Sequence, residues 1–165
     1  MAKSLSRTDK EIADLYERHK NMLYRICFAY MKNPADTEDA VETVFYRLIV
    51  AAPRFENEAH EKAWLIRTAA NICKNELKAW RRKTENIEDH CELCGAKDVE
   101  TDGVLDAVLG LPEKYKTVVY LYYYEGYRTP EIAAILKKPK STVRNYLHEA
   151  RALLRERLGD DFLEE

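Results

Sequence analysis

The sequence predicts an all-α protein made of two small helical domains. Apolar residues recur three and four positions apart along most of the chain, which is typical of amphipathic helices. Only five glycines and five prolines occur in 165 residues, so the many tight turns of a β-sandwich or barrel are not expected. The longest apolar run, Val118 to Tyr124, is too short to cross a bilayer, and the N-terminus lacks a secretory signal. We therefore expect a cytoplasmic protein without membrane insertion.

The first half, residues 1–83, predicts a bundle of three amphipathic helices. Ser6 or Thr8 can cap the first helix, and Asn33-Pro34 ends it because proline disfavours the helical conformation in the residue before it. The second helix stops before Pro53, and the third runs from about His60 to Arg82. The faces predicted to be buried are Ile12, Leu15, Tyr16, Leu23, Ile26, Cys27, Tyr30 and Met31, then Val41, Val44, Phe45, Leu48, Ile49 and Ala52, then Leu65, Thr68, Ala69, Ile72, Leu77 and Trp80.

Residues 84–103 read as an acidic linker, because they contain seven acidic residues, one lysine and few large apolar side chains. Within the linker, His90, Cys91 and Cys94 could supply zinc ligands, or the two cysteines could form a redox pair. No second CxxC or paired histidine follows, so we favour incidental cysteines and assign no metal and no cofactor. His19 and His60 also lack a ligand pattern, and surface or core positions are expected for them.

The second half, residues 104–165, predicts a smaller helical domain. A short helix ends at Leu109, and another runs from Glu113 to Gly126. Thr129 caps a short third helix, and after Lys137-Lys138-Pro139 a basic helix runs from about Ser141 to Leu158. A short helix, a tight turn and a longer basic helix are typical of a helix-turn-helix.

Two helix faces in the sequence suit nucleic acid, although the formal net charge of the chain is only −2. On the third helix a stripe of cations, amides and one aromatic residue would fit a melted strand, where cations hold phosphates and aromatic rings stack on bases. The alternative is a solvated face with Trp64 packed against a neighbouring helix. The stripe consists of Trp64, Arg67, Asn71, Lys74, Asn75 and Lys78, followed by Arg81 and Arg82.

On the last helix, the face away from the core would read duplex DNA in the major groove. Its hydroxyls and backbone N–H groups suit phosphate, and Arg and Asn can pair with guanine and adenine. The alternative is an ordinary surface helix. The residues on this face are Lys140, Ser141, Thr142, Arg144, Asn145, His148 and Arg151. No glycine-rich phosphate loop, nucleophile elbow or paired catalytic carboxylate occurs, so an enzyme is not expected.

Three stretches carry a family resemblance. Residues 33–48 read NPADTEDAVETVFYRL and residues 64–83 read WLIRTAANICKNELKAWRRK. Both resemble the second region of bacterial sigma factors of the extracytoplasmic-function class, and residues 109–158 resemble their fourth region. The resemblance implies a sigma-70 family factor that binds core RNA polymerase and directs promoter recognition, DNA melting and transcription initiation.

The resemblance also implies roles for particular positions. The helix beginning near Asp36 would dock on the coiled-coil of the largest polymerase subunit, and the second domain on the flap of the second-largest. Phe55 and the loop after it would hold a base of the minus-ten element, Asn71 would touch the melted strand, and Lys140 to Arg151 would read the minus-thirty-five element. An anti-sigma protein is a candidate further partner. The implied docking contacts are Asp39, Glu42, Phe45, Arg47 and Leu48.

Two stretches depart from the family pattern. Glu42-Thr43 stands where Gln-Glu is common, and Lys137-Lys138-Pro139 replaces a turn that usually begins with glycine. Without the glycine, the turn lacks the residue that most easily adopts a left-handed conformation. At the next position, the aliphatic stem of Lys138 occupies a place that an apolar core residue normally fills. The alternative function is a stand-alone helix-turn-helix regulator that binds duplex DNA, but the first half shows no dimer interface or effector pocket.

Overall fold

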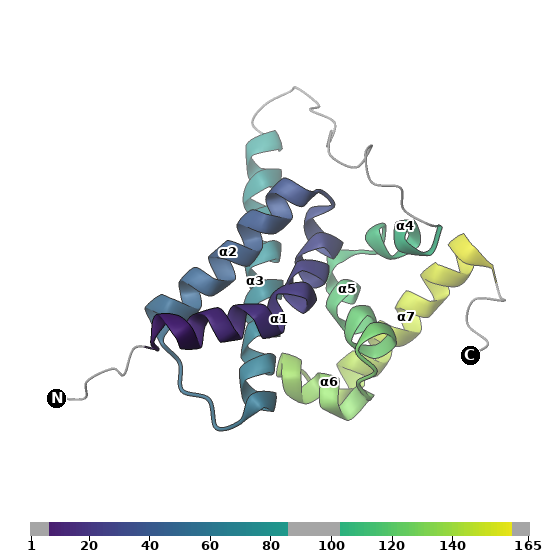
Figure 1. Cartoon of the computed structure of the whole chain (residues 1–165). Helices are drawn as coiled ribbons and strands as arrows, with labels where there is room; N and C mark the ends of the chain where they lie inside the picture. Colours follow the sequence, from purple (N-terminus) through teal and green to yellow (C-terminus); the bar gives the residue numbers. More distant parts are fainter. Residues whose placement is uncertain (1–6, 86–102, 160–165) are drawn as a thin grey trace. The chain divides into compact units, whose positions relative to one another are not determined.

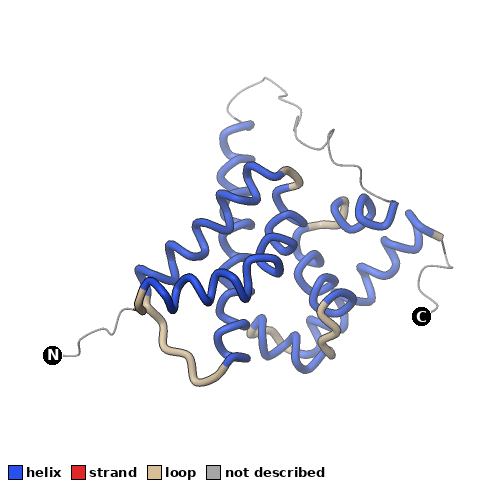
Figure 2. Tube along the Cα trace, in the orientation of Figure 1, coloured by secondary structure: helices blue, strands red, loops and turns tan. Residues whose placement is uncertain are grey.

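The computed structural model describes residues 7–85 and 103–159, and Figure 2 shows that every regular element in these two ranges is a helix. The all-α prediction is therefore confirmed. The chain divides into two compact units, Met1–Arg82 and Lys83–Glu165, which are described one after the other. His90, Cys91 and Cys94 lie outside the described residues, as does most of the predicted linker.

The first unit contains three helices: α1 (Asp9–Met31), α2 (Pro34–Ala51) and α3 (Glu58–Glu85) (Figure 1). Their ends follow the local signals in the sequence. Thr8 caps α1, because its hydroxyl accepts from the Glu11 N–H at 3.2 Å and the Glu11 carboxylate accepts from the Thr8 N–H at 2.8 Å. Asn33 caps α2 in the same way, accepting from the Asp36 N–H at 2.9 Å.

The core of the first unit lies among the facing sides of its three helices. Leu23, Val44 and Leu65, one from each helix, have no exposed surface. Both cysteines of this unit, Cys27 and Cys73, are buried and form no disulfide. These inward faces bury apolar area that stabilises the bundle at roughly 25 cal/mol per Å².

Of the residues predicted to be buried, three are exposed, and four more are only half-buried: Ile12, Ala52, Thr68 and Leu77. Tyr16, Ile49 and Trp80 keep 43%, 52% and 39% of their surface exposed. Ile49 follows Leu48 around α2 and falls outside the arc that the neighbouring helices cover. Trp80 lies beyond Cys73, after which no described side chain of α3 is fully buried, so this helix extends past its packing partners.

The second unit contains four α-helices and a short π-helical segment. They are α4 (Gly103–Leu109), α5 (Glu113–Val119), η1 (Tyr120–Tyr124), α6 (Thr129–Leu136) and α7 (Lys140–Leu158). The helices α4, α5 and α6 all contact α7, and the core forms along its inward face. One cluster of this core consists of the buried residues Ala107, Leu111, Tyr115, Val119, Ala150 and Leu154. Leu121, Ile132 and Val143 have no exposed surface either.

Two local features of this unit differ from the sequence prediction. The predicted helix from Glu113 to Gly126 widens into a π-helical turn, in which the Glu125 N–H donates to the Tyr120 carbonyl at 3.3 Å. At the start of α6, Thr129 is the first helical residue rather than the cap. The Arg128 N–H, just before the helix, donates to the Glu131 carboxylate at 3.0 Å.

The turn between α6 and α7 completes the predicted helix-turn-helix. Lys137 adopts the left-handed conformation with φ of 53°, where a glycine would meet no Cβ penalty. The Lys138 N–H donates to the Ala133 carbonyl at 3.0 Å, which satisfies one of the last carbonyls of α6. The turn therefore keeps its tight geometry without the glycine, at the cost of strain at Lys137.

Replacing Lys137 by glycine should relieve this strain. Lys137→Gly is expected to raise the free energy of unfolding of the second unit by about 1 kcal/mol, because a left-handed residue with a Cβ costs about that much. Urea denaturation followed by circular dichroism measures the change. Lys140→Gly is the matched control: it lies in the right-handed first turn of α7 and should lower stability. A Lys137→Gly variant no more stable than wild type would contradict the strain assignment.

Candidate nucleic-acid interface

An aromatic cluster forms where the loop of residues 52–57 joins α2 to α3. The half-buried Phe55 ring meets the His60 ring edge-on, with centroids 5.4 Å apart, and lies 5.9 Å from the Trp64 ring. The Arg7 guanidinium carbon lies 4.8 Å from the centroid of the Phe55 ring. We call Arg7, Phe55, His60 and Trp64 the Phe55 cluster. Trp64 thus packs on the loop, and the cluster offers aromatic surface beside the start of α3.

Hydrogen bonds fix the His60 side of this cluster. The Asn57 side-chain oxygen accepts from the His60 N–H at 2.8 Å, which caps the first turn of α3. His60 Nδ1 accepts from the Glu56 N–H at 3.2 Å, so the ring uses its Nδ1 lone pair within the loop. The short stretch between α2 and α3 is thereby tied to the helix that follows it.

The predicted stripe lies along the continuous helix α3. Asn71, Asn75 and Lys78 are exposed, whereas Arg67 and Lys74 are half-buried. Burial lowers the pKa of Arg67 below its usual value, but a guanidinium stays charged. From Trp64 to Lys78 the helix rises about 21 Å, enough to follow several nucleotides of a single strand.

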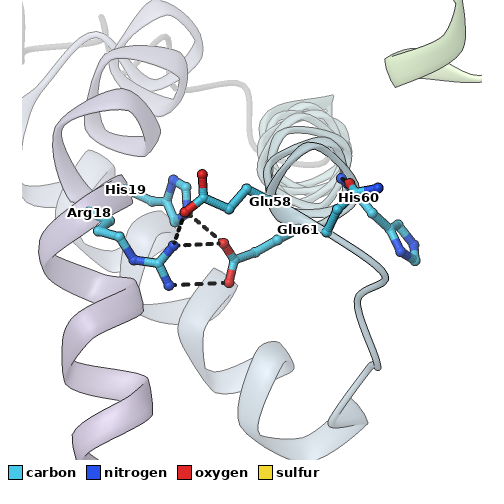
Figure 3. Close-up of polar contacts among 6 residues, drawn as sticks. Arg18, His19, Glu58, His60 and Glu61 are labelled. Atoms are coloured by element: carbon cyan, nitrogen blue, oxygen red, sulfur yellow. Dashed lines mark hydrogen bonds and ion pairs between the residues drawn. The ribbon is translucent and has the colours of Figure 1, made fainter.

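A buried carboxylate joins the start of α3 to α1. Glu61 is only 8% exposed, and Figure 3 shows its side chain pointing toward Arg18 and His19. Arg18 donates to the two Glu61 oxygens at 3.1 and 3.4 Å, and His19 Nε2 lies 3.2 Å from Glu61 Oε2. Arg18 also reaches Glu58 at 3.3 Å, while His60 points away from this group. Sequence patterns cannot predict this cluster, because its members on α1 and α3 lie about forty residues apart.

In the second unit, the exposed face of α7 carries most of the predicted duplex-reading residues. Thr142 is half-buried at the same end of the helix. The exposed residues are Lys140, Ser141, Arg144, Asn145 and His148.

Arg151 differs from the other residues of this face because its side chain is engaged within the unit. It is half-buried, and its Nε donates to the Tyr123 hydroxyl at 2.9 Å. Its guanidinium carbon lies 5.2 Å from the centre of the Tyr122 ring. The hydrogen bond to Tyr123 raises the pKa of Arg151 above its usual value. These contacts join α7 to the segment η1, which contains both tyrosines.

On α2 the structure separates the five proposed docking residues into two groups. Asp39, Glu42 and Arg47 are exposed. Phe45 is 7% exposed and Leu48 has no exposed surface. Phe45 and Leu48 fill the core of the unit, so of the five residues only Asp39, Glu42 and Arg47 present their side chains at its surface.

Three other apolar side chains of α2 face outward. Tyr46, Ile49 and Val50 keep 67%, 52% and 66% of their surface exposed. We call these three residues the outer face of α2. Their three- and four-residue spacing is itself helical, so the sequence contained a signal for a second apolar face, which the inward face obscured.

The described ranges contain no group of three His, Cys, Asp or Glu residues that could hold a metal ion. Within the same ranges, no helix combines the length and hydropathy needed to span a membrane.

Comparisons with known proteins agree on one family. The family model "Sigma-70 region 2" matches residues 15–84, and "Sigma-70, region 4" matches residues 102–154. The RNA polymerase sigma factor SigV of Bacillus subtilis is 30% identical, with 88% of this chain and 89% of that protein covered. The ECF RNA polymerase sigma factor SigW of the same organism is 29% identical, with 96% and 95% covered.

A solved structure shares the fold. It is the sigma factor RpoE from Bartonella quintana in complex with the anti-sigma factor NepR, with a TM-score of 0.74 and 17% identity over 94% of this chain and 99% of that chain. The chain belongs to the sigma-70 family of RNA polymerase sigma factors, in the extracytoplasmic-function (ECF) class. A stand-alone helix-turn-helix regulator is not favoured, because matches to both sigma regions occur in one chain.

The two groups of apolar residues on α2 should respond differently to truncation. Leu48→Ala is expected to lower the free energy of unfolding by about 2–5 kcal/mol, because it leaves a cavity in the core. Ile49→Ala, the matched control on the exposed face, should change it by less than about 1 kcal/mol. Urea denaturation of both variants checks this, and equal losses would mean that Ile49 is also a core residue.

Proposed function

We propose that this sigma factor uses three separate surfaces: the exposed face of α7 for upstream duplex DNA, the Phe55 cluster and α3 for the melted strand, and α2 for core polymerase. We assign residues 1–83 and 104–165 to the two working domains, with the acidic segment 84–103 between them. The chain supplies specificity and no catalysis of its own, since the chemistry of RNA synthesis belongs to the polymerase. It works where the polymerase does, in the cytoplasm.

The exposed N-terminal part of α7 supports the assignment to the minus-thirty-five element. A recognition helix enters the major groove with its first turns, where its positive dipole end favours phosphate. Arg144 and Asn145 are exposed there and can donate to base edges, while Lys140 and Ser141 suit the backbone. Arg151 serves a bracing role in this assignment, because Tyr122 and Tyr123 already hold its guanidinium.

The Phe55 cluster supports the assignment to the minus-ten element. Extruding a base costs a few kcal/mol of unstacking, and stacking on an aromatic ring offsets part of that cost. Phe55 and Trp64 supply such rings, and Asn71 and Lys78 follow along α3 with an amide and a cation. The strand would therefore run from the loop along the helix.

The outer face of α2 supports docking on polymerase. Exposed apolar side chains at helical spacing are typical of a protein interface, and charges at the rim fix orientation. Tyr46, Ile49 and Val50 provide the apolar area, and Asp39 and Glu42 lie on the same helix. We propose the coiled-coil of the largest subunit as the partner of this helix, and the flap of the second-largest subunit as the partner of the second unit. An anti-sigma protein would compete for one of these surfaces.

One observation carries the proposal: the first unit exposes apolar side chains on α2 and has an aromatic cluster at the start of α3, neither of which a duplex-binding regulator would need. The test is transcription in vitro with core polymerase over a promoter library. The protein should select promoters that share an upstream and a downstream element, and core polymerase alone should not.

Reversing two charges on α2 makes this test specific. Asp39→Lys with Glu42→Lys should abolish most of the transcription and weaken association with core polymerase by about tenfold or more, because like charges at an interface repel. Asp14→Lys with Glu17→Lys is the matched control on α1 and should leave both unchanged, since the exposed Glu17–Lys20 pair contributes little. Normal association of the α2 variant, with an intact fold, would refute the docking assignment.

Removing Arg144 tests the upstream assignment. Arg144→Ala should weaken binding by about 1–3 kcal/mol at promoters with the preferred base pair, and less at promoters that lack it. Competition assays with holoenzyme and upstream-element variants measure the difference. Arg155→Ala, an exposed arginine in the last turn of α7, is the control and should have no sequence-dependent effect. Equal losses on every promoter would make Arg144 a phosphate contact.

A further inference from the structure

We infer that Arg7 and Glu61 are positioning residues that determine which base the loop of residues 52–57 accepts. They hold the two ends of the 52–57 loop in place, Arg7 from the segment before α1 and Glu61 through contacts with α1. This inference rests on the proposed function of the loop, and it adds the residues that set its selectivity.

Arg7 holds the first part of the loop. Its Nη2 donates a hydrogen bond to the Pro53 carbonyl, and its guanidinium lies over the Phe55 ring at 4.8 Å. A planar guanidinium can make both contacts at once, which fixes the ring relative to the backbone two residues earlier. Arg7 therefore restricts the orientation of Phe55 without belonging to the core of the unit.

Glu61 holds the other end. Its backbone N–H donates to the Asn57 carbonyl at 3.1 Å, so it belongs to the turn where the loop becomes α3. Its buried carboxylate is bound by Arg18 and His19 (Figure 3). A buried carboxylate without partners costs several kcal/mol, so this turn stays where α1 can reach it.

The loop needs such support because its own backbone supplies little. Ala52 begins it in the left-handed conformation, with φ of 43°, which costs free energy for a residue with a Cβ. No helix or strand forms between Ala52 and Glu58. A site that discriminates between bases must hold its contact groups within a fraction of an ångström, and supporting side chains provide that rigidity. Loss of either anchor should therefore reduce discrimination more than it reduces stability.

The experiment measures base discrimination by preassembled holoenzyme. The probe is a fluorescent single-stranded DNA oligonucleotide that carries the minus-ten element selected in the promoter library, compared with probes substituted at single bases. For Arg7→Ala, the discrimination ratio, which is the affinity for the preferred probe divided by that for a substituted probe, should fall about tenfold. One cation–π contact and one hydrogen bond together supply binding free energy in that range. Arg7→Lys, which keeps a cation and one donor, should recover part of the ratio.

Lys10→Ala is the matched control for charge, because it removes an exposed cation from the first turn of α1. Its ratio should equal that of wild type. If Arg7→Ala and Lys10→Ala lower binding to all probes equally, Arg7 acts only through charge and the inference is overturned.

Glu61→Gln tests the second anchor, with Glu76→Gln, an exposed carboxylate on the same helix, as its control. Glu61→Gln should lower the discrimination ratio severalfold, and Glu76→Gln should not. If Glu61→Gln unfolds the first unit, Arg7→Ala still decides the question. An unchanged ratio in Arg7→Ala refutes the positioning role alone, whereas a wild-type holoenzyme that binds no probe refutes the proposed function of the loop.

Discussion

Among the described residues of the first unit, Glu61 is the one charged residue that is buried, and its carboxylate constrains how α3 meets α1. A charge with 8% exposure needs partners, and α1 supplies both of them, Arg18 and His19. Because Glu61 lies in the first turn of α3, the contact fixes where that helix starts relative to α1. Together with the contacts of Arg7 to Pro53 and Phe55, this contact holds the loop that precedes α3.

The same physical rule shapes the helix in each unit that we propose binds nucleic acid. In each, one helix buries an apolar face and leaves polar side chains on the other face. On α7 the exposed face is short and lies at the positive end of the helix, which suits the groove of a duplex. On α3 the stripe continues for about 21 Å beyond an aromatic cluster, which suits an extended single strand.

The helix α2 divides its apolar residues between the core and an outer surface. Leu48 and Phe45 point inward, while Tyr46, Ile49 and Val50 remain in contact with water. Exposed apolar area of this kind costs solubility unless a partner covers it, and charged neighbours such as Asp39 and Glu42 limit non-specific association. The division explains why a helix of a small bundle carries more apolar residues than its own core can use.

The sequence by itself determined most helix ends, because those signals act within about four residues; the start of α6 and the π-helical turn after Val119 are the exceptions. The Thr8 capping box, Asn33-Pro34 and the left-handed Gly126 are examples. Its motifs also identified the family and the two helices that we propose face DNA. Tertiary structure alone decided that Ile49 lies at the surface, that Arg151 binds Tyr123, and that Glu61 joins Arg18. The spacing of apolar residues predicts which side of a helix faces the core. It does not predict how far around the helix the neighbouring helices bury its side chains. Contacts across twenty-eight to forty-three residues depend on how the elements pack.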